Sequence, residues 1–183
     1  KQESSITCSH CTYRNINKEA FSSLMLSFDS VVSSSNKETT FVNRTCTQEL
    51  DDLLRGSFRD ELIEGRTCDN CHQTRNEIRK LQLIKSPQIL MLMIRRYDNN
   101  GHRINKTLDI PYYLNLTDYF FCKSNQTHHE KTVRYQICAI ACHYGSLQNG
   151  HYYSLVFFEN KWYKIDDHNV QHIEKLPSSS EYY

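Results

Sequence analysis

The sequence predicts an α+β, strand-rich fold in which an antiparallel sheet carries a projecting ribbon held by cysteines. Three observations lead to this prediction. Two Cys-x-x-Cys motifs lie between segments with strand-like patterns. Residues 48–64 have the spacing of an amphipathic helix. Near the C-terminus, two aromatic segments flank the short polar turn Glu159-Asn160-Lys161, which is typical of a β-hairpin.

The length and charge of the chain limit the classes of function. A chain of 183 residues is expected to form one domain, or one domain with a protruding subdomain. A net charge of +1 gives no electrostatic reason to expect nucleic acid or an anionic membrane as a partner. The longest apolar run, Ile89–Ile94, is far shorter than the ~20 residues of a membrane span.

The N-terminal half predicts strands around one helix. Leu24, Leu26 and Phe28 alternate as in a strand with one buried face, and the polar stretch Ser30–Thr40 is interpreted as an insertion. Large apolar residues then recur at spacings of three and four, which predicts the helix 48–64. They are Leu50, Leu53, Leu54, Phe58 and Leu62.

The C-terminal half predicts further strands. Residues 74–84 alternate between polar and apolar, whereas the run 89–94 shows no alternation and predicts a central strand buried on both faces. Cys122–Lys131 is interpreted as a polar linker and residues 133–142 as another buried strand. The Ser-rich tail from Pro177 is expected to fray.

The two Cys-x-x-Cys motifs together supply the ligand set of a closed tetrahedral zinc site. These ligands are Cys8, Cys11, Cys68 and Cys71. Because four sulfur ligands leave no position for water, the zinc would be structural. Disulfides or a redox pair are the alternatives, although no βαβ pattern supports a thioredoxin-like motif. His10 and His72 lie beside the ligands and are interpreted as surface residues.

The cellular compartment is read from the cysteines and from glycosylation motifs. Four Asn-x-Thr sequons would suit a secreted protein, but a chain rich in Asn, Ser and Thr forms some by chance. They begin at Asn43, Asn105, Asn115 and Asn125. The grouping of half of the eight cysteines into metal-type motifs favours a reducing compartment, the cytoplasm or the nucleus.

The C-terminal hairpin predicts a histidine beside a carboxylate. His151 begins the first strand, and the second strand ends on Asp166 and Asp167. Antiparallel pairing brings the start of one strand beside the end of the other, so the imidazole would meet an acidic side chain. A histidine held by a carboxylate supplies the base and the orienting group of a nucleophile–base–orienter triad. A structural histidine next to ordinary turn residues is the alternative.

No cysteine stands out as the nucleophile for such a base. Cys138 and Cys142 suit buried core thiols, and Cys122 lies in the expected linker. Cys46 lies at the expected helix N-terminus, which lowers a thiol pKa, but the nearby acidic residues oppose that effect. The chain therefore supplies a base and an orienter without a convincing nucleophile.

The order of these motifs resembles a known family. It runs from Cys-x-x-Cys through the acidic helix and the second Cys-x-x-Cys to the strand Ile89–Tyr97 and the hairpin Gly150-His-Tyr…Trp162-Tyr-Lys-Ile-Asp-Asp. It is similar to the C-terminal part of the catalytic domain of ubiquitin-specific proteases, which are papain-like cysteine deubiquitinases. The hairpin is specific to that family, and the two Cys-x-x-Cys motifs agree with it independently.

The resemblance implies roles for individual residues. His151 corresponds to the catalytic base, Asp166 to the residue that orients it, and Asp167 to the acidic neighbour that supports or replaces Asp166. The four motif cysteines correspond to the zinc ligands at the tip of the "fingers" that grip ubiquitin. The loops 98–105 and 143–150 resemble those over the channel for the modifier's C-terminal tail, a channel that would include His143, Gly150 and Tyr152.

The resemblance also implies a division of the chain and a missing part. Residues 1–88 would form the fingers with the palm-associated helix, and residues 89–183 the palm with the His/Asp hairpin. The family's nucleophilic cysteine lies in an N-terminal Cys box on the helical "thumb", and nothing in this sequence matches it. We therefore expect hydrolysis of the isopeptide bond after the C-terminal glycine of ubiquitin only when the thumb half is also present.

Two other functions stay open at this point. One is a non-catalytic ubiquitin-binding or scaffold module that keeps the fold and the zinc site. The other is a protease for a ubiquitin-like modifier. The intact pair of His151 and Asp166 favours the enzyme, because a scaffold has no need for it.

Overall fold

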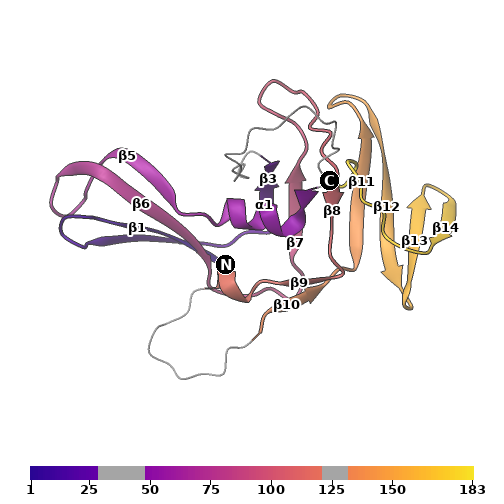
Figure 1. The fold of residues 1–183 in the computed structure, drawn as a ribbon, viewed down its shortest axis with the longest axis horizontal. Coiled ribbons are helices and arrows are strands. Elements are labelled where there is room, and N and C mark those ends of the chain that lie inside the picture. Colours follow the sequence, from indigo (N-terminus) through magenta and orange to yellow (C-terminus); the bar gives the residue numbers. More distant parts are fainter. Residues whose placement is uncertain (29–47, 121–131) are drawn as a thin grey trace, which may run out of the picture. The chain divides into compact units, whose positions relative to one another are not determined.

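The computed structural model describes residues 1–28, 48–120 and 132–183 (Figure 1). It forms two compact units, which we describe separately. The first comprises Lys1–Leu24, Phe58–Met91 and Asn115–Tyr135, and the second Met25–Ser57, Leu92–Leu114 and Gln136–Tyr183. Cys46, Cys122, the expected insertion Ser30–Thr40 and the expected linker after Phe121 lie outside the described residues.

The first unit is built on an antiparallel sheet of order β2-β1-β6-β5. Its strands are β1 Gln2–Thr7, β2 Arg14–Glu19, β5 Glu61–Thr67 and β6 Thr74–Leu83. The β1–β2 and β5–β6 hairpins each turn through one Cys-x-x-Cys motif. Because Thr7 pairs with Ile78 in the central β1–β6 ladder, both turns lie at the same end of the sheet.

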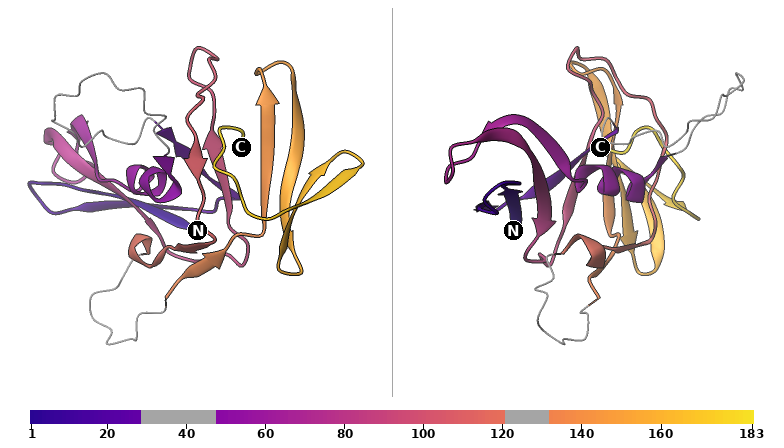
Figure 2. Two further views of the ribbon diagram at one scale, coloured as in Figure 1. Left: turned by 45° about the vertical axis from the view of Figure 1, so that its right-hand side comes forward. Right: turned by 60° about the vertical axis from the view of Figure 1, so that its left-hand side comes forward.

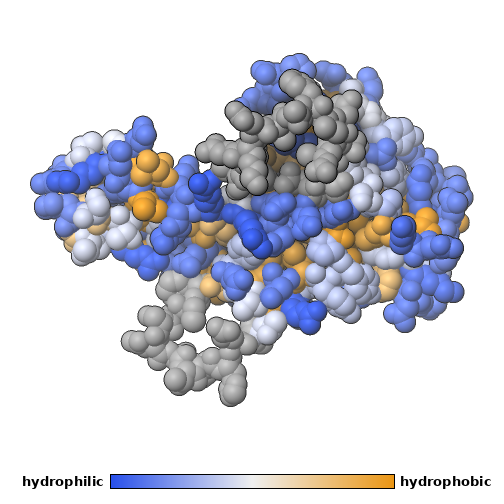
Figure 3. Space-filling model, in the orientation of Figure 1, coloured by the Kyte–Doolittle hydropathy of each residue, from blue (hydrophilic) through white to orange (hydrophobic). Residues whose placement is uncertain are grey.

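The face of this sheet over β5 and β6 exposes apolar side chains. Leu62 and Ile78 are paired in register and are 58% and 48% exposed. Figure 3 shows a small apolar patch over these two strands on an otherwise hydrophilic surface.

The single helix among the described residues, α1 Leu50–Ser57, is shorter than the expected helix 48–64. Leu50, Leu53 and Leu54 are buried on one side of it, as the spacing predicts. The extension beyond Ser57 was wrong, because Leu62 lies in β5, whose ladder to β6 supplies its backbone hydrogen bonds. Gly56 and Ser57 are weak helix formers and favour an end at this point.

The second unit contains an antiparallel sheet of order β11-β12-β13-β14. Its strands are β11 Ala139–Gly145, β12 Gly150–Phe158, β13 Lys161–Asp166 and β14 Asn169–Ile173. The expected hairpin is confirmed by the β12–β13 pairing, which runs from Ser154↔Ile165 to Phe158↔Lys161. A separate pair joins β3 Ser23–Ser27 to β7 Met91–Arg95.

The C-terminal segment is ordered, so the expectation of a frayed tail was wrong. Tyr182 is 1% exposed. The Tyr183 backbone accepts a hydrogen bond from Ile94 N at 2.7 Å and donates one to Ala141 O at 2.9 Å, which links β7 to β11 (Figures 1 and 2). The Ser-rich stretch thus leads into a buried tyrosine and main-chain pairing on both sides, which composition alone does not reveal.

Two further strand predictions need correction. The run 89–94 forms β7 only from Met91, and Met91 is 57% exposed while Ile94 is 5% exposed. An apolar run does not specify which segments will cover a strand. Residues 133–142 divide into β10 Arg134–Gln136 and β11, because these two strands pair with different partners.

Short elements complete the chain. The parallel pair is β4 Gln48–Glu49 with β8 Leu108–Asp109, the antiparallel pair is β9 Tyr113–Asn115 with β10, and a 3₁₀ turn spans Thr117–Tyr119. Within the described part of the chain, no helix has the length and apolar character needed to cross a membrane.

Candidate functional sites

The four motif cysteines converge at the end of the first sheet. Cys8 Sγ lies 3.8 Å from Cys71 Sγ, and Cys11 Sγ lies 3.7 Å from Cys68 Sγ. All four sulfurs lie within 4.8 Å of one another. Four sulfurs at the Zn–S distance of ~2.3 Å in a tetrahedron are separated by about 3.8 Å, so this geometry fits a zinc ion.

The two Cys-x-x-Cys turns have the same backbone hydrogen bonds. Thr12 N donates to Cys8 O at 3.1 Å, and His72 N donates to Cys68 O at 3.0 Å. Both residues that follow the second cysteine have positive φ, 59° for Thr12 and 56° for His72. The repeated geometry directs both pairs of sulfurs to one point, and His72 is exposed, as expected for a surface residue.

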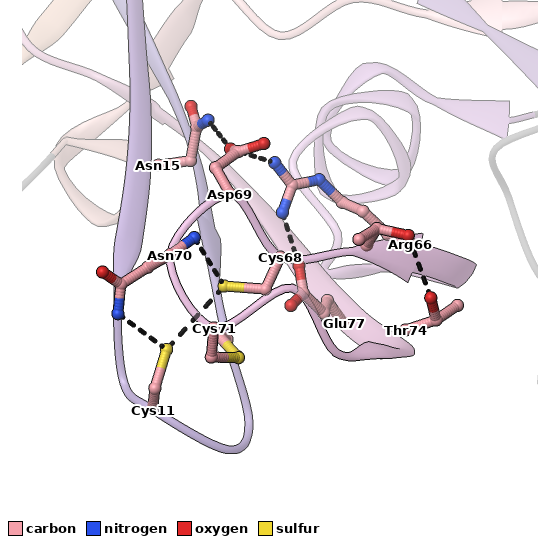
Figure 4. A network of polar contacts seen from close by, with 11 residues as sticks. Cys11, Asn15, Arg66, Cys68, Asp69, Asn70, Cys71, Thr74 and Glu77 are labelled. Carbon is pink, nitrogen blue, oxygen red and sulfur yellow. Dashed lines mark hydrogen bonds and ion pairs between the residues drawn. The ribbon is translucent and has the colours of Figure 1, made fainter.

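Polar side chains surround the sulfurs and join the two turns (Figure 4). Asp69 accepts hydrogen bonds from Asn15 at 2.7 Å and from Arg66 at 2.9 Å, so it connects β2 to the second turn. Arg66 also donates to the buried Glu77 at 2.8 Å. Such outer interactions orient metal ligands.

Hydrogen bonds to sulfur favour the thiolate that a metal requires. The Asn70 side-chain amide donates to Cys11 Sγ at 3.5 Å. This bond and the backbone N–H of Tyr13 lower the pKa of Cys11 to about 6. Desolvation and contacts with neighbouring sulfurs raise the pKa of Cys8 to about 11 and also raise the pKa of Cys71. The convergence of the four sulfurs, rather than their pKa values, therefore fits a metal ion, with no fifth donor required among the described residues.

In the second unit, His151 and Asp166 meet as the hairpin predicts. Nε2 of His151 lies 2.5 Å from Oδ1 of Asp166. The β12–β13 ladder ends at the pair Ser154↔Ile165, and Asp166 follows directly on β13. Continuing that register by one residue puts Asp166 beside Tyr153, which shares a face of β12 with His151, so the pair is diagonal on one face. Asp167 follows in a turn with φ 51°, and donor atoms of all three residues lie within 4.8 Å of one another.

The electrostatic surroundings keep Asp166 ionised. Two hydrogen bonds lower the pKa of the Asp166 carboxyl: the larger effect comes from His151 and the smaller from Lys164. Lys164 Nζ lies 3.1 Å from Oδ2 of Asp166. Tyr144 lies opposite His151 in the β11–β12 ladder, with 5.3 Å between the ring centroids.

The three residues expected to line a tail channel differ in exposure, and two of them, His143 and Tyr152, are partners in the β11–β12 ladder and point to the face opposite that of His151. His143 is 5% exposed and Tyr152 is 57% exposed, with 4.5 Å between their ring centroids. A Cβ on Gly150 would lie 2.7 Å from Tyr144 O and would also clash with the His143 imidazole. Gly150 is thus required by close packing, whereas a role in a channel stays a prediction.

Arg103 is a structural residue that the sequence analysis missed. Its guanidinium donates to His143 O at 2.7 Å, to Gly145 O at 3.2 Å and to Ser180 O at 3.2 Å. It thereby joins loop 98–105 to the β11–β12 loop. A cavity of about 550 Å³ lies between these loops, with Tyr97, Arg103 and Leu147 among its lining residues.

The cysteines described in the second unit do not suit a nucleophile for His151. Cys142 is fully buried, which raises its pKa to about 11, so its thiol stays protonated. Cys138 is exposed rather than buried as expected, because it precedes β11. Its carbonyl accepts from Phe157 N, six residues beyond His151, or about 20 Å along the strand.

Comparisons with known proteins agree on one family. The model of the family "Ubiquitin carboxyl-terminal hydrolase" matches residues 3–183. Ubiquitin carboxyl-terminal hydrolase 8 of Arabidopsis thaliana is 36% identical over 122 residues, which cover 63% of this chain and 14% of that protein. Ubiquitin carboxyl-terminal hydrolase 12 of Saccharomyces cerevisiae is 31% identical over 146 residues, covering 75% of this chain and 11% of that protein.

Solved structures share the fold. The SAGA DUB module bound to ubiquitin aldehyde has a chain that matches 99% of this one with a TM-score of 0.76 at 22% identity. A yeast SAGA DUB module matches 99% of this chain with a TM-score of 0.75 at 23% identity. This chain covers 39% and 38% of those two chains. The strand-rich α+β architecture predicted from the sequence is confirmed.

Proposed function

Because the chain belongs to the ubiquitin carboxyl-terminal hydrolase family, we propose that it is part of a thiol-dependent deubiquitinase. The reaction is hydrolysis of the isopeptide bond after the C-terminal glycine of ubiquitin. The observation that carries this proposal is the 2.5 Å contact between His151 Nε2 and Asp166 Oδ1. A binding module would not require this pair.

The contact between His151 Nε2 and Asp166 indicates which ring nitrogen of His151 acts as the general base. When Nε2 carries the proton that is donated to Asp166, the lone pair is on Nδ1. Nδ1 takes the proton of the attacking thiol and later gives it to the leaving amine. Asp166 stabilises the imidazolium that forms between these two steps and fixes the ring orientation.

We propose that the thiol comes from the Cys box of the thumb half of the catalytic domain. Cys142 is buried and protonated, and Cys138 lies far along the strand from His151. Cys8, Cys11, Cys68 and Cys71 form a set of their own. The nucleophile is therefore sought outside the described residues.

We also propose that zinc binds the four cysteines and has a structural role. The separations of 3.7 and 3.8 Å between paired sulfurs support this proposal. A bound zinc ion would join the β1–β2 and β5–β6 hairpins, and no ligand position would be open to substrate. In the same scheme, residues 1–88 are the fingers and residues 89–183 are the palm. The channel for the modifier's C-terminal tail is bordered by His143, Gly150 and Tyr152.

Ubiquitin or a ubiquitinated protein is the proposed partner, in the cytoplasm or the nucleus. The test is hydrolysis of a fluorogenic amide at the C-terminus of ubiquitin by the full-length protein, beside its His151→Ala and Asp166→Asn variants. We expect turnover that both substitutions reduce. Turnover that is unchanged in both variants would contradict the assignment. Preference for a ubiquitin-like modifier would change the substrate, and binding without turnover would favour the scaffold.

A further inference from the structure

We propose that Lys164 is a positioning residue that holds the Asp166 carboxylate in the orientation required by His151. This inference rests on the proposed function, because it concerns the same base and orienter. The three motif-matched catalytic and orienting positions, His151, Asp166 and Asp167, do not include Lys164. Its role follows from contacts on the face of the β12–β13 hairpin that carries the pair.

The Asp166 carboxylate is shared between two partners. Its Oδ1 contacts His151 Nε2 at 2.5 Å, and its Oδ2 contacts Lys164 Nζ at 3.1 Å. A carboxylate with one bound oxygen can rotate about its terminal torsion, which has a broad energy profile. Two bound oxygens remove that freedom, so the ammonium group sets the direction in which Oδ1 points.

Lys164 is itself positioned by a contact with an aromatic ring on β12. Its Nζ lies 4.3 Å from the centroid of the Tyr153 ring, a cation–π geometry. The Tyr153 hydroxyl donates to Glu181 Oε2 at 2.6 Å. The C-terminal segment that carries Glu181 also accepts a hydrogen bond from His143 N at 2.8 Å. A continuous series of contacts therefore runs from the ordered tail through Tyr153 and Lys164 to Asp166.

The strand pattern explains why these groups share one face. Lys164 and Asp166 are two residues apart on β13, so their side chains point to the same side. Tyr153 and His151 have the same relationship on β12. The side chains of His151, Lys164 and Asp166 are 34%, 35% and 27% exposed, so solvent screens the ion pair and weakens it.

The other charged and polar groups around His151 do not provide the same support. Asp167 follows Asp166 and adds a second negative charge, while Tyr144 packs against the imidazole from β11. Lys164 Nζ contacts the Asp166 carboxylate at 3.1 Å, whereas Lys161 on the same strand is exposed. Lys161 therefore offers a matched control for the loss of one positive charge from β13.

The experiment uses the full-length protein with Lys164→Met, Lys164→Arg and, as the control, Lys161→Met. Methionine keeps the length of the side chain and removes the charge. Turnover of a fluorogenic ubiquitin amide gives kcat and KM, and carbon NMR gives the pKa of the Asp166 carboxyl. The NMR measurement does not depend on turnover, and thermal unfolding shows that each variant is folded.

We expect Lys164→Met to lower kcat about fivefold with little change in KM, near the upper limit for a partly exposed ion pair. The Asp166 pKa should rise, because one of the groups that lower it has been removed. Lys164→Arg should restore both values and Lys161→Met should change neither. The Lys164→Met effect should also largely vanish in an Asp166→Asn background.

The outcomes separate this inference from the proposed function. An unchanged kcat and an unchanged Asp166 pKa in Lys164→Met, with kcat reduced in Asp166→Asn, would overturn the role of Lys164 alone. An equal loss in Lys161→Met would show a general charge effect and would also overturn it. If His151→Ala and Asp166→Asn both leave kcat unchanged, the proposed function fails, whatever Lys164 does.

Discussion

The four-cysteine site and the His–Asp site are positioned by different parts of the backbone: tight turns hold the cysteines, and strand pairing holds the histidine and the aspartate. Each Cys-x-x-Cys turn builds half of its site from local backbone geometry, and the two halves have matching hydrogen bonds at Cys8 and Cys68. The donor set is complete within the first unit. The pair of His151 and Asp166 instead depends on strand register, and its proposed reaction requires a thiol from outside the described residues.

The comparison shows that a site can be identified from its sequence motif although it lacks one of the groups that its proposed reaction needs. Removing one cysteine should therefore damage the structure around it, whereas removing His151 should damage only chemistry.

The largest effect is expected from the metal site. Cys68→Ser removes a buried member of the proposed ligand set and should abolish zinc binding, whose apparent free energy at structural sites is about 10–16 kcal/mol. The sheet β2-β1-β6-β5 should then lose amide-exchange protection, measured together with zinc content. Cys138→Ser, at an exposed cysteine outside the cluster, is the control and should retain the metal. Full zinc content in Cys68→Ser would contradict the site.

If the proposed function holds, His151→Ala should lower kcat of the full-length protein by about 10²- to 10⁴-fold, the usual contribution of a general base. The melting temperature should stay close to that of the parent, because the imidazole is 34% exposed. His168→Ala, in the exposed turn after Asp167, is the matched control. A comparable loss in that control would remove the special role of His151.

Gly150→Ala should destabilise the second unit by about 1–3 kcal/mol, because the new Cβ overpacks against Tyr144 O and the His143 imidazole. Chemical denaturation measures the loss. Gly65→Ala provides a comparison, since Gly65 has φ +62° but no atom within 4 Å of the added Cβ. The loss for Gly65→Ala measures the cost of alanine at positive φ without a clash, and an unchanged stability of Gly150→Ala would mean that packing at Gly150 is not tight.

The smallest effect concerns pH. Backbone N–H groups of His102 and Asn100 hold the pKa of Asp98 below its usual value. A lowered carboxyl pKa gives stability that is present above the unfolded pKa of about 3.9 and is lost as pH falls through the folded value. Asp98→Asn should therefore flatten the acid side of the stability–pH curve. An unchanged acid slope would show that these hydrogen bonds do not favour the ionised form.

Much of both sites could be predicted because their residues are close in sequence or joined by a short hairpin. The Cys-x-x-Cys turns and the meeting of His151 with Asp166 follow from local geometry and strand pairing. The helix was predicted too long, because apolar spacing cannot reveal that Leu62 pairs with Ile78 in a ladder.

Other features depend on contacts between distant segments. Arg96 is 1% exposed, and its guanidinium donates to Tyr182 O at 2.7 Å and to Lys106 O at 2.5 Å. Burial lowers its pKa to about 10. Neither this cluster nor the Arg103 contacts have a signal in the sequence, since their acceptors are main-chain carbonyls that any residue can supply.

The most direct measurement is to treat the full-length protein with ubiquitin carrying a C-terminal electrophile and to map the modified cysteine. The account predicts one adduct on a cysteine of the Cys box, lost when His151 is replaced by alanine. An adduct on Cys46, Cys138 or Cys142 would contradict the proposed source of the thiol. Bound ubiquitin without any adduct would contradict the proposed chemistry and leave a binding module.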